Sequence, residues 1–469
     1  KTKTSSTNKE IVKLQESLPH AKVVYASATA MSSVDHLSAM SRLGLWGPGT
    51  RYASYKEFEN KWKNQTRSGL EIVSAELASQ GLYIARRLSL EGAEFDLSIC
   101  DPTQEQLSLH SRLCDWWTEL SHMENVLVGI QGRAKLWGDH LRFFKALFVS
   151  FRVEHCVKLT EQEIAKGHSV VISLISTGEA ATKRAMDLED EEEEASGSKG
   201  KVEEEGLVAL RHTMETIIKY AIDNFLGAAV PDRLYELKNE IETFDLPQSP
   251  LDLLIHRLGF IKNEKGQTNR VVELTGRQLA YRMGADGKWL VTKRLRKGED
   301  VRDANIRGCK QFQNGDKEIA ITSSAVATGI SLHNHKKGKD RRRIHIQMEL
   351  AWAADQAIQT LGRTLRSEQH NPPKYVQFSS SFQAEQRFAQ TVAERAQRLG
   401  AATTGDRRGS GSDRAFGSDL LVGTHASDAM YKMCGALQRE VWPKWCQHTQ
   451  DEETGQPIED WVDFSRGVK

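Results

Sequence analysis

The sequence predicts an α/β fold in which a parallel sheet is covered by helices. Four short apolar strands are expected at residues 170–175, 318–322, 344–349 and 375–378, with helical patterns between or after them. The first strand runs through Ser176-Thr177-Gly178 into a helical segment, which is typical of a β-α unit. Because strands that alternate with helices form sheets covered by those helices, this order favours a parallel sheet.

The composition limits the class of protein. With 469 residues, of which 39% are hydrophobic, the chain is long enough for two or three cores. Its 64 Lys and Arg nearly balance its 63 Asp and Glu, so any attraction to a polyanion must come from local clusters. The six cysteines form no C-x-x-C pair, which argues against a zinc site or a disulfide framework and favours a reducing, intracellular compartment. No run of about 18 apolar residues is present, so no membrane span is expected.

A Q-x-x-G-R-x-x-R pattern, formed by Gln359, Gly362, Arg363 and Arg366, stands at the start of an expected helix. Arginines three apart on a helix share one face, and together they can reach phosphate oxygens across a cleft. Guanidinium groups supplied by a neighbouring lobe typically accelerate phosphoryl transfer by about 10³ to 10⁵. Taken alone, two such arginines fit a solvated or salt-bridged helix face equally well.

A small-residue segment, Ser323 to Ser331, follows the strand expected at residues 318–322. Small side chains, Gly329 among them, let backbone amides approach a phosphate or a sugar closely. A tight strand-to-loop turn would need the same residues. Both interpretations stay open from this segment alone.

A basic cluster precedes the strand expected at residues 344–349. It consists of Lys336, Lys337, Lys339, Arg341, Arg342 and Arg343. Contact with phosphates is one interpretation, and a solvated loop that joins two elements is the other, which we favour. The flanking histidines, His333, His335 and His345, lack acidic or Cys partners at ligand spacing, so no metal site is predicted.

Several sequence motifs are absent. There is no G-x-x-x-x-G-K-[ST] phosphate loop and no D-E-x-H box. No G-x-G-x-x-G follows a strand, which excludes a dinucleotide-dependent metabolic enzyme. Residue 1 is Lys rather than Met, so the native start is expected upstream.

The order of the motifs is more specific than any one of them. A buried strand is expected at residues 21–28, and it ends in Ser27-Ala28-Thr29. The β-α unit at residue 170 follows, then Thr328-Gly329-Ile330, then the arginine pattern at 359–366. This is the order of motifs III to VI in superfamily 2 helicases, which the chain resembles.

A closer resemblance, over residues 20–422, is to the strawberry notch family. The segments that carry it are VVYASATA (23–30), MSRLGLWGPGT (40–50), GLYIARRLSLEGAEF (81–95), RFFKALFVSFRV (142–153), VVISLISTGEA (170–180), LDLLIHRLG (251–259), VVELTGR (271–277), ATGISL (327–332), RRRIHIQMELAWAADQAIQTLGRTLRS (341–367) and EQRFAQTVAERAQRLGAATTGDRRG (385–409).

The resemblance implies a two-lobed RecA-like ATPase. We expect a C-terminal remnant of the first RecA-like lobe at 1–65, a mainly helical connecting region at 66–165, a RecA-like parallel-sheet second lobe at 166–422 and an unplaced extension at 423–469. The second lobe is expected to hold a largely helical insert at 185–305. In this insert the acidic run 187–201 lacks apolar surface and is expected to be disordered, and a hairpin is expected at 270–295, turning at 285–287.

Carried over by position, the resemblance assigns roles to single residues. Gln359, Arg363 and Arg366 would act on the γ-phosphate; Gly329, Ser331 and Gly362 would line the nucleotide; Ser27 and Thr29 would couple nucleotide to nucleic acid; and Ser323, Arg341 and Arg342 would face the nucleic acid. Ser331 stands where the superfamily usually has Asp, which puts its ribose contact in question.

The function expected is that of the C-terminal part of an ATP-dependent helicase or translocase acting in transcription regulation in the nucleus. ATP with Mg²⁺ would be held only in the parent protein, because the family's phosphate loop and acidic box lie upstream of Val23, so this chain alone is expected not to hydrolyse ATP. Its partners would be a DNA or RNA backbone and transcription or chromatin factors. The alternative is a non-catalytic scaffold for such factors.

Overall fold

The computed structural model describes residues 6–26, 34–62, 66–84, 92–123, 126–127, 129–175, 209–227, 229–262, 266, 268, 270–296, 298–323, 330–336, 338–349, 354–382 and 385. All of them lie within Lys1–Ala415. The expected acidic loop at 187–201 and the extension at 423–469 lie outside the described residues, and the domain boundaries stay predictions. No helix in the described part is long and apolar enough to cross a membrane.

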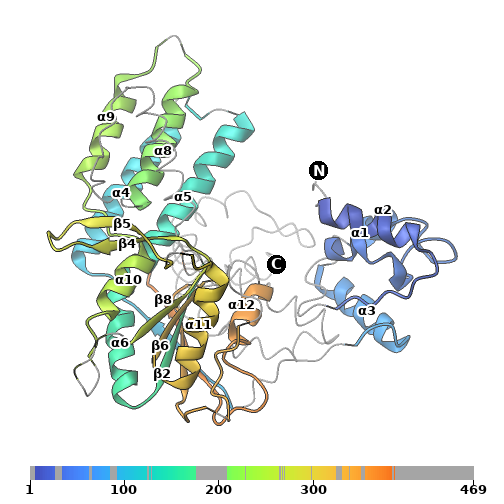
Figure 1. Ribbon diagram of the computed structural model, residues 1–469. Helices are drawn as coiled ribbons and strands as arrows, with labels where there is room; N and C mark the ends of the chain where they lie inside the picture. The colour runs from blue at the N-terminus through green and yellow to red at the C-terminus, as the bar shows by residue number, and fades with distance from the viewer. Residues whose placement is uncertain are drawn as a thin grey trace, which may run out of the picture. The chain divides into compact units, whose positions relative to one another are not determined.

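A six-stranded sheet, parallel throughout, forms the centre of the larger part of the molecule (Figure 1). Its strands are β1 (Glu94–Ile99), β2 (Ser169–Leu174), β3 (Val271–Leu274), β6 (Ile319–Ser323), β7 (Arg343–Gln347) and β8 (Lys374–Ser379). Their spatial order is β1-β8-β7-β2-β6-β3. The predicted parallel sheet and its four predicted strands are confirmed, because β2, β6, β7 and β8 fall where the apolar runs were.

Two strands of the sheet were not predicted. β1 lies in the region expected to be mainly helical, where its half-exposed sequence EFDLSI forms an edge of the sheet. β3 lies at the start of the expected hairpin, yet it pairs with β6 in the main sheet. Edge strands bury little apolar surface, so their sequences carry a weaker pattern than the central strands.

Helices cover both faces of the sheet (Figure 1). On one face α6 (Val153–Ala165) and α10 (Pro250–Leu258) pack on an apolar layer that includes Ile172, Ile321 and Ile346. On the other face lie α11 (Val301–Asn314) and α12 (Ala354–Leu361). Alternate residues of a strand point to opposite faces, and on this second face several of them are polar.

Between successive strands of the sheet, the chain forms a helical bundle. It contains α4 (Gln104–His122), α5 (Gly129–Phe151), α8 (Ala209–Asp223), α9 (Asp232–Glu240) and the 3-10 turn η3 (Ile241–Thr243). Thr103 starts α4 with a reciprocal capping box to Gln106. In the core, Trp116 donates from Nε1 to the Leu237 carbonyl at 3.0 Å. Phe143, Phe144 and Phe148 of α5 are buried in this core, whereas Trp137 of the same helix is 60% exposed.

A two-stranded antiparallel hairpin follows β3, formed by β4 (Leu279–Met283) and β5 (Trp289–Lys293). The predicted turn at 285–287 is confirmed, since Gly284 N donates to Lys288 O at 2.7 Å and Gly287 adopts a left-handed φ of 81°. The hairpin is shorter than the expected 270–295.

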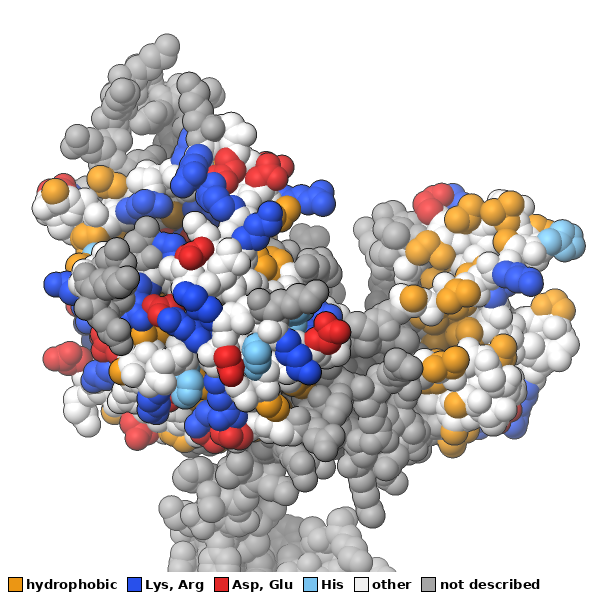
Figure 2. All heavy atoms as spheres, turned by 60° about the horizontal axis from the view of Figure 1, so that its bottom comes forward, with side chains coloured by type: hydrophobic (Ala, Val, Ile, Leu, Met, Phe, Trp, Pro, Cys, Tyr) orange, Lys and Arg blue, Asp and Glu red, His pale blue; other side chains and the backbone are white. Residues whose placement is uncertain are grey.

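The N-terminal part is small and helical. It comprises α1 (Ser6–Ser17), η1 (Val34–Ala39), η2 (Ser41–Leu43), α2 (Tyr55–Trp62) and α3 (Thr66–Ser79) around a core that includes Leu37, Phe58 and Leu77. Figure 2 shows many hydrophobic side chains on the surface of this part. The strand expected at 21–28 is wrong for residues 21–26, which form no strand and leave Val24 89% exposed. The described residues 6–84 hold no other strand with which it could pair.

Gly308 of α11 tests how closely that helix packs on β3, and Gly138 of α5 serves as its control. A Cβ on Gly308 of α11 would lie 2.4 Å from Val272 Cγ2 and 2.9 Å from Leu274 Cδ2. Gly308→Ala is therefore expected to lower the free energy of unfolding by about 1 to 3 kcal/mol through overpacking. On α5 a Cβ at Gly138 would meet only the flexible Arg142 guanidinium, at 3.4 Å, so Gly138→Ala is expected to raise that free energy by about 0.5 to 1 kcal/mol.

Urea unfolding followed by circular dichroism measures both changes. If Gly308→Ala were as well tolerated as Gly138→Ala, the close packing of α11 on β3 would be wrong.

Candidate functional site

The candidate site lies at the carboxyl edge of the central strands. After β2 the chain adds β3 and β6 on one side, and it then crosses to the other side of β2 to form β7 and β8. In open α/β sheets, ligands bind outside the carboxyl ends of the strands at such a reversal of strand order. The reversal here brings together the ends of β2, β6 and β7.

Arg363 is buried at this edge and is only 2% exposed. Its Nη1 donates to Thr322 Oγ1 at 2.9 Å, and its Nη2 donates to the Ser323 carbonyl at 3.3 Å. Its own carbonyl accepts from Leu332 N at 2.8 Å. Burial lowers the pKa of Arg363 to about 10, so the guanidinium stays protonated at neutral pH and fixes the segment after α12 to the end of β6.

A chain of buried side chains connects the same segment to β2 and β7. His345 Nε2 bonds Ser173 Oγ at 2.7 Å, and His345 Nδ1 bonds Thr364 Oγ1 at 2.8 Å. Ser173 Oγ in turn bonds Thr322 Oγ1 at 3.0 Å. The contacts therefore run from Arg363 through two hydroxyls and the imidazole back to Thr364, the next residue in the chain.

His345 is neutral in this network. Burial, assisted by the positive charge of Arg363, lowers the pKa of His345 to about 3. A neutral imidazole donates from one ring nitrogen and accepts at the other, which suits its two hydroxyl partners. A protonated ring would place a second positive charge beside the guanidinium.

Two buried polar atoms at the site have no hydrogen-bond partner among the described residues. They are Ser323 Oγ and Arg363 Nε. Buried polar atoms are nearly always hydrogen-bonded, so unpartnered ones point to a contact with a residue or ligand beyond those described. Both atoms can donate, which fits the oxygen of an anion such as a phosphate.

The arginine pattern stands at the end of a helix, not at its start as predicted. α12 ends at Leu361, so Arg363 and Arg366 lie in the turn beyond it and do not share a helix face. Arg363 is buried, whereas Arg366 is exposed and Gln359 is half-exposed. Of the four pattern residues only Gln359 lies in α12, and Gly362 directly follows the end of the helix.

The remaining nucleotide residues are only partly placed. Ser331 Oγ bonds His333 Nδ1 at 2.7 Å, and the Ser331 carbonyl accepts from Gln313 Nε2 at 2.7 Å. Ser331 directly precedes Leu332, whose amide donates to the Arg363 backbone carbonyl. Gly329, like Ser27 and Thr29, is outside the described residues.

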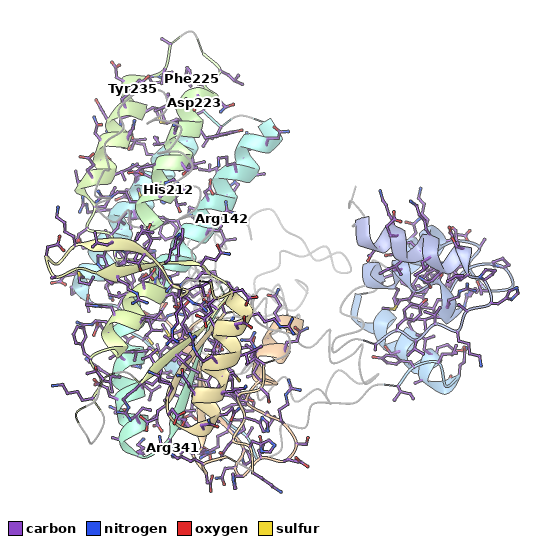
Figure 3. All side chains as sticks on the ribbon, in the orientation of Figure 1. Arg142, His212, Asp223, Phe225, Tyr235 and Arg341 are labelled. Carbon is purple, nitrogen blue, oxygen red and sulfur yellow. The ribbon has the colours of Figure 1, made fainter. Side chains whose placement is uncertain are left out.

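The residues expected to face nucleic acid lie at opposite edges of the sheet. Ser323 ends β6, whereas Arg341 and Arg342 precede β7 at the amino edge (Figure 3 labels Arg341). Arg341 pairs with Glu318, and Arg342 Nη2 contacts Glu94 Oε1 at 2.8 Å. These ion pairs fit the alternative interpretation of the basic cluster, a solvated loop that joins two elements.

Sequence reasoning missed Thr322, Ser173 and His345 as members of the site. Their signal was available, because each is a polar residue inside a strand that is buried along its whole length. Such a residue must find partners on its face of the sheet. Which partners it finds depends on strand order, which the sequence pattern does not reveal.

Together, the six-stranded parallel sheet, its helical layers and the arginine at the strand reversal define an α/β lobe of the RecA-like type. A family model described as the C-terminal domain on Strawberry notch homologue matches residues 249–459, and one described as P-loop containing NTP hydrolase pore-1 matches residues 1–112. The chain belongs to the strawberry notch family, and its resemblance to that family is confirmed.

Curated relatives agree with this assignment. Strawberry notch homolog 2 of Mus musculus is 30% identical over 490 residues, which cover 85% of this chain and 36% of that protein. Strawberry notch homolog 1 of Rattus norvegicus is 30% identical over 523 residues, covering 92% of this chain and 40% of that protein. FORGETTER 1 of Arabidopsis thaliana is 26% identical, covering 92% and 43%. The chain thus spans well under half the length of these relatives.

Solved structures align less closely. The C-terminal part of the Fun30 ATPase domain aligns at 13% identity over 64% of this chain and 89% of that chain, with a TM-score of 0.29. Mycobacterium smegmatis helicase Lhr aligns with a TM-score of 0.23 at 13% identity, over 67% of this chain and 22% of that chain. Scores this low add nothing to the fold, which rests on the sheet itself.

His345 predicts a pH dependence of stability. Its folded-state pKa of about 3 lies below the 6.5 of an unperturbed histidine, so its contribution is complete above about pH 6.5 and is lost as the pH falls toward 3. From about pH 7.5 to about pH 5 this group alone is expected to lower the free energy of unfolding by about 2 kcal/mol.

His345→Gln keeps a neutral donor and acceptor and should lack that component. Urea unfolding at both pH values measures it, with the exposed His155→Gln as the matched control. Stability that falls as steeply with pH in His345→Gln as in the wild type would contradict a buried, neutral imidazole.

Proposed function

We propose that this chain supplies the second RecA-like lobe of an ATP-dependent nucleic-acid translocase of the strawberry notch type. Residues 1–65 would add the end of the first lobe, with Ser27 and Thr29 coupling nucleotide to nucleic acid. The family's model for a P-loop NTP hydrolase over residues 1–112 supports a nucleotide-using parent protein. Hydrolysis would need the upstream elements, so the chain alone is expected to be inactive.

The observation that carries this proposal is the unequal placement of the two arginines. Arg363 is buried and held by Thr322 and the Ser323 carbonyl, while Arg366 is exposed three residues later. A guanidinium that is fixed in advance stabilises developing charge without reorganisation. An exposed arginine beside it can reach across a cleft to a phosphate supplied by another lobe.

The residues present fit a triphosphate at this edge. Arg363 Nε is a buried donor without a partner among the described residues, and Gln359 is half-exposed on the last turn of α12. ATP would supply the phosphoryl group, and these residues would bind and orient its terminal oxygens. Gly329, Ser331 and Gly362 would line the rest of the nucleotide. Mg²⁺ would be held by the acidic box of the first lobe.

The biological setting proposed here rests on family membership. Nuclear localisation, a role in transcription regulation, and transcription or chromatin factors as partners are carried over from the family resemblance. Nucleic acid of either kind is the proposed track, with Ser323 facing a phosphate at the carboxyl edge. Arg341 and Arg342 remain proposed contacts only if they exchange their carboxylate partners for phosphates.

ATPase activity of the full-length parent protein tests this function. With single-stranded nucleic acid present, Arg366→Ala is expected to lower kcat by about 10³-fold or more, because it removes charge stabilisation without disturbing a buried contact. Arg366→Lys should restore little, since an ammonium cannot bind two oxygens in the guanidinium geometry. Lys158→Ala, exposed on α6, is the matched control.

Arg363→Ala is expected to lose activity and stability together, so its unfolding midpoint is measured alongside. Wild-type turnover that nucleic acid does not stimulate, or an Arg366→Ala variant as active as the wild type, would reject the motor and favour a scaffold for transcription or chromatin factors.

A further inference from the structure

The hairpin β4–β5 and the strand end after it carry a concentrated positive charge. Residues 279–297 contain Arg282, Lys288, Lys293, Arg294, Arg296 and Lys297 against a single carboxylate, Asp286. The chain as a whole is balanced, with 64 basic and 63 acidic residues, and Figure 2 shows both signs intermixed on the face of the larger part that it displays. A polyanion is therefore drawn to local clusters such as this one.

A buried charge network fixes the root of the hairpin. Arg277 Nη1 bonds Asp252 Oδ1 of α10 at 2.6 Å, and Arg277 Nε bonds Glu273 Oε1 of β3 at 2.8 Å. Arg294, just after β5, donates from Nη1 to the Thr275 carbonyl at 2.8 Å and from Nη2 to Asn305 Oδ1 of α11 at 3.0 Å. The positive charges of Arg277 and Arg294 thus balance the negative charges of Asp252 and Glu273 inside the protein.

The far end of the hairpin is anchored as well. Trp289 packs edge-on against His256 of α10, with 5.2 Å between ring centroids. Asp286 Oδ1 accepts from Lys288 N at 3.1 Å and closes the turn. The hairpin is therefore held at both ends against α10, so its exposed side chains have defined positions relative to the sheet.

Three cations of this segment take no part in the anchoring. Arg282, Lys293 and Arg296 are exposed. Among the carboxylates of the described residues, none forms an ion pair with any of the three. They contrast with Arg341 and Arg342, whose charges are already matched by glutamates.

The hairpin leaves the sheet at the same edge as the arginine site. Leu274, the last residue of β3, lies in register with Thr322 of β6, which binds Arg363. Thr275 and the hairpin root follow directly. A ligand that passes over the carboxyl edge near Ser323 can therefore continue along the hairpin.

Arg282 pairs across the ribbon with Leu290 and Lys293 pairs with Leu279, so these two cations lie on opposite faces of the hairpin. We propose that hairpin β4–β5 is a nucleic-acid-binding site that contacts the phosphate backbone through Arg282, Lys293 and Arg296. The proposal rests on the proposed function and names the surface that the nucleic acid occupies. A two-stranded ribbon is narrow enough to enter the major groove of a duplex, and spaced cations also follow a single strand. Exposed Leu290 lies on the face of Arg282 and exposed Met283 on the face of Lys293, and both add apolar contact.

Fluorescence anisotropy of the full chain with labelled oligonucleotides tests the site. The probes are single-stranded DNA, single-stranded RNA and duplex DNA, each titrated between about 50 and 200 mM salt. The variant combines Arg282→Ala, Lys293→Ala and Arg296→Ala, all at exposed positions. Its control combines Arg51→Ala, Lys158→Ala and Lys238→Ala, which remove the same charge from exposed positions outside the hairpin.

The hairpin variant is expected to bind at least about tenfold more weakly at low salt, with a salt slope shallower by about 2 on a single strand, while the control keeps both values. An unchanged urea midpoint shows that the variant is folded. An equal loss of affinity in both triple variants, or no loss in the hairpin variant, would overturn the proposal. The hairpin surface would then bind another polyanion, such as the chain's own acidic run at 187–194. A wild-type chain that binds no probe would overturn both this site and the nucleic-acid part of the proposed function, whereas the Arg366→Ala assay tests nucleotide turnover separately.

Discussion

The burial of the Arg363 guanidinium against the end of β6 is the constraint around which the polar face of the sheet is organised. A charged group loses its hydration when buried, and only hydrogen bonds and nearby dipoles offset that loss. Thr322 and the Ser323 carbonyl supply them. Removing one partner of such a group leaves a buried donor without an acceptor, at a cost of about 1 to 3 kcal/mol, so the strand end and the arginine depend on one another.

Backbone hydrogen bonds join the segment Leu332–Asn334 to the chain that follows α12. Leu332 N donates to the Arg363 carbonyl at 2.8 Å, and His370 N donates to the Asn334 carbonyl at 2.8 Å. Residues that follow the small-residue segment are thus tied to residues that follow the arginine pattern. A displacement of one loop has to be accommodated by the other, which is what a lobe needs if nucleotide and nucleic acid are to influence each other.

The two edges of the sheet differ in how their charged and polar groups are paired. At the amino edge, Arg341 and Arg342 are neutralised by Glu318 and Glu94, and they connect β7 to its neighbours. At the carboxyl edge, buried donors without described partners and exposed cations remain. Because all six strands are parallel, their carboxyl ends all lie at one edge of the sheet. Residues from distant parts of the sequence can therefore contact a ligand at that edge.

The sequence by itself determined the fold class, the four inner strands and the family, since central parallel strands are continuous apolar runs and the motif order is specific. It also singled out Arg363, Arg366 and Ser323, while the strand expected over residues 21–26 and the helix face for the two arginines were wrong. Only the tertiary structure decided that Arg363 is buried and Arg366 exposed, that His345 closes a polar network with Ser173, and that Arg341 and Arg342 lie at the other edge. Periodicity records which face of an element is buried, whereas the partners of a buried polar group are set by strand order, which joins residues that are far apart in the chain.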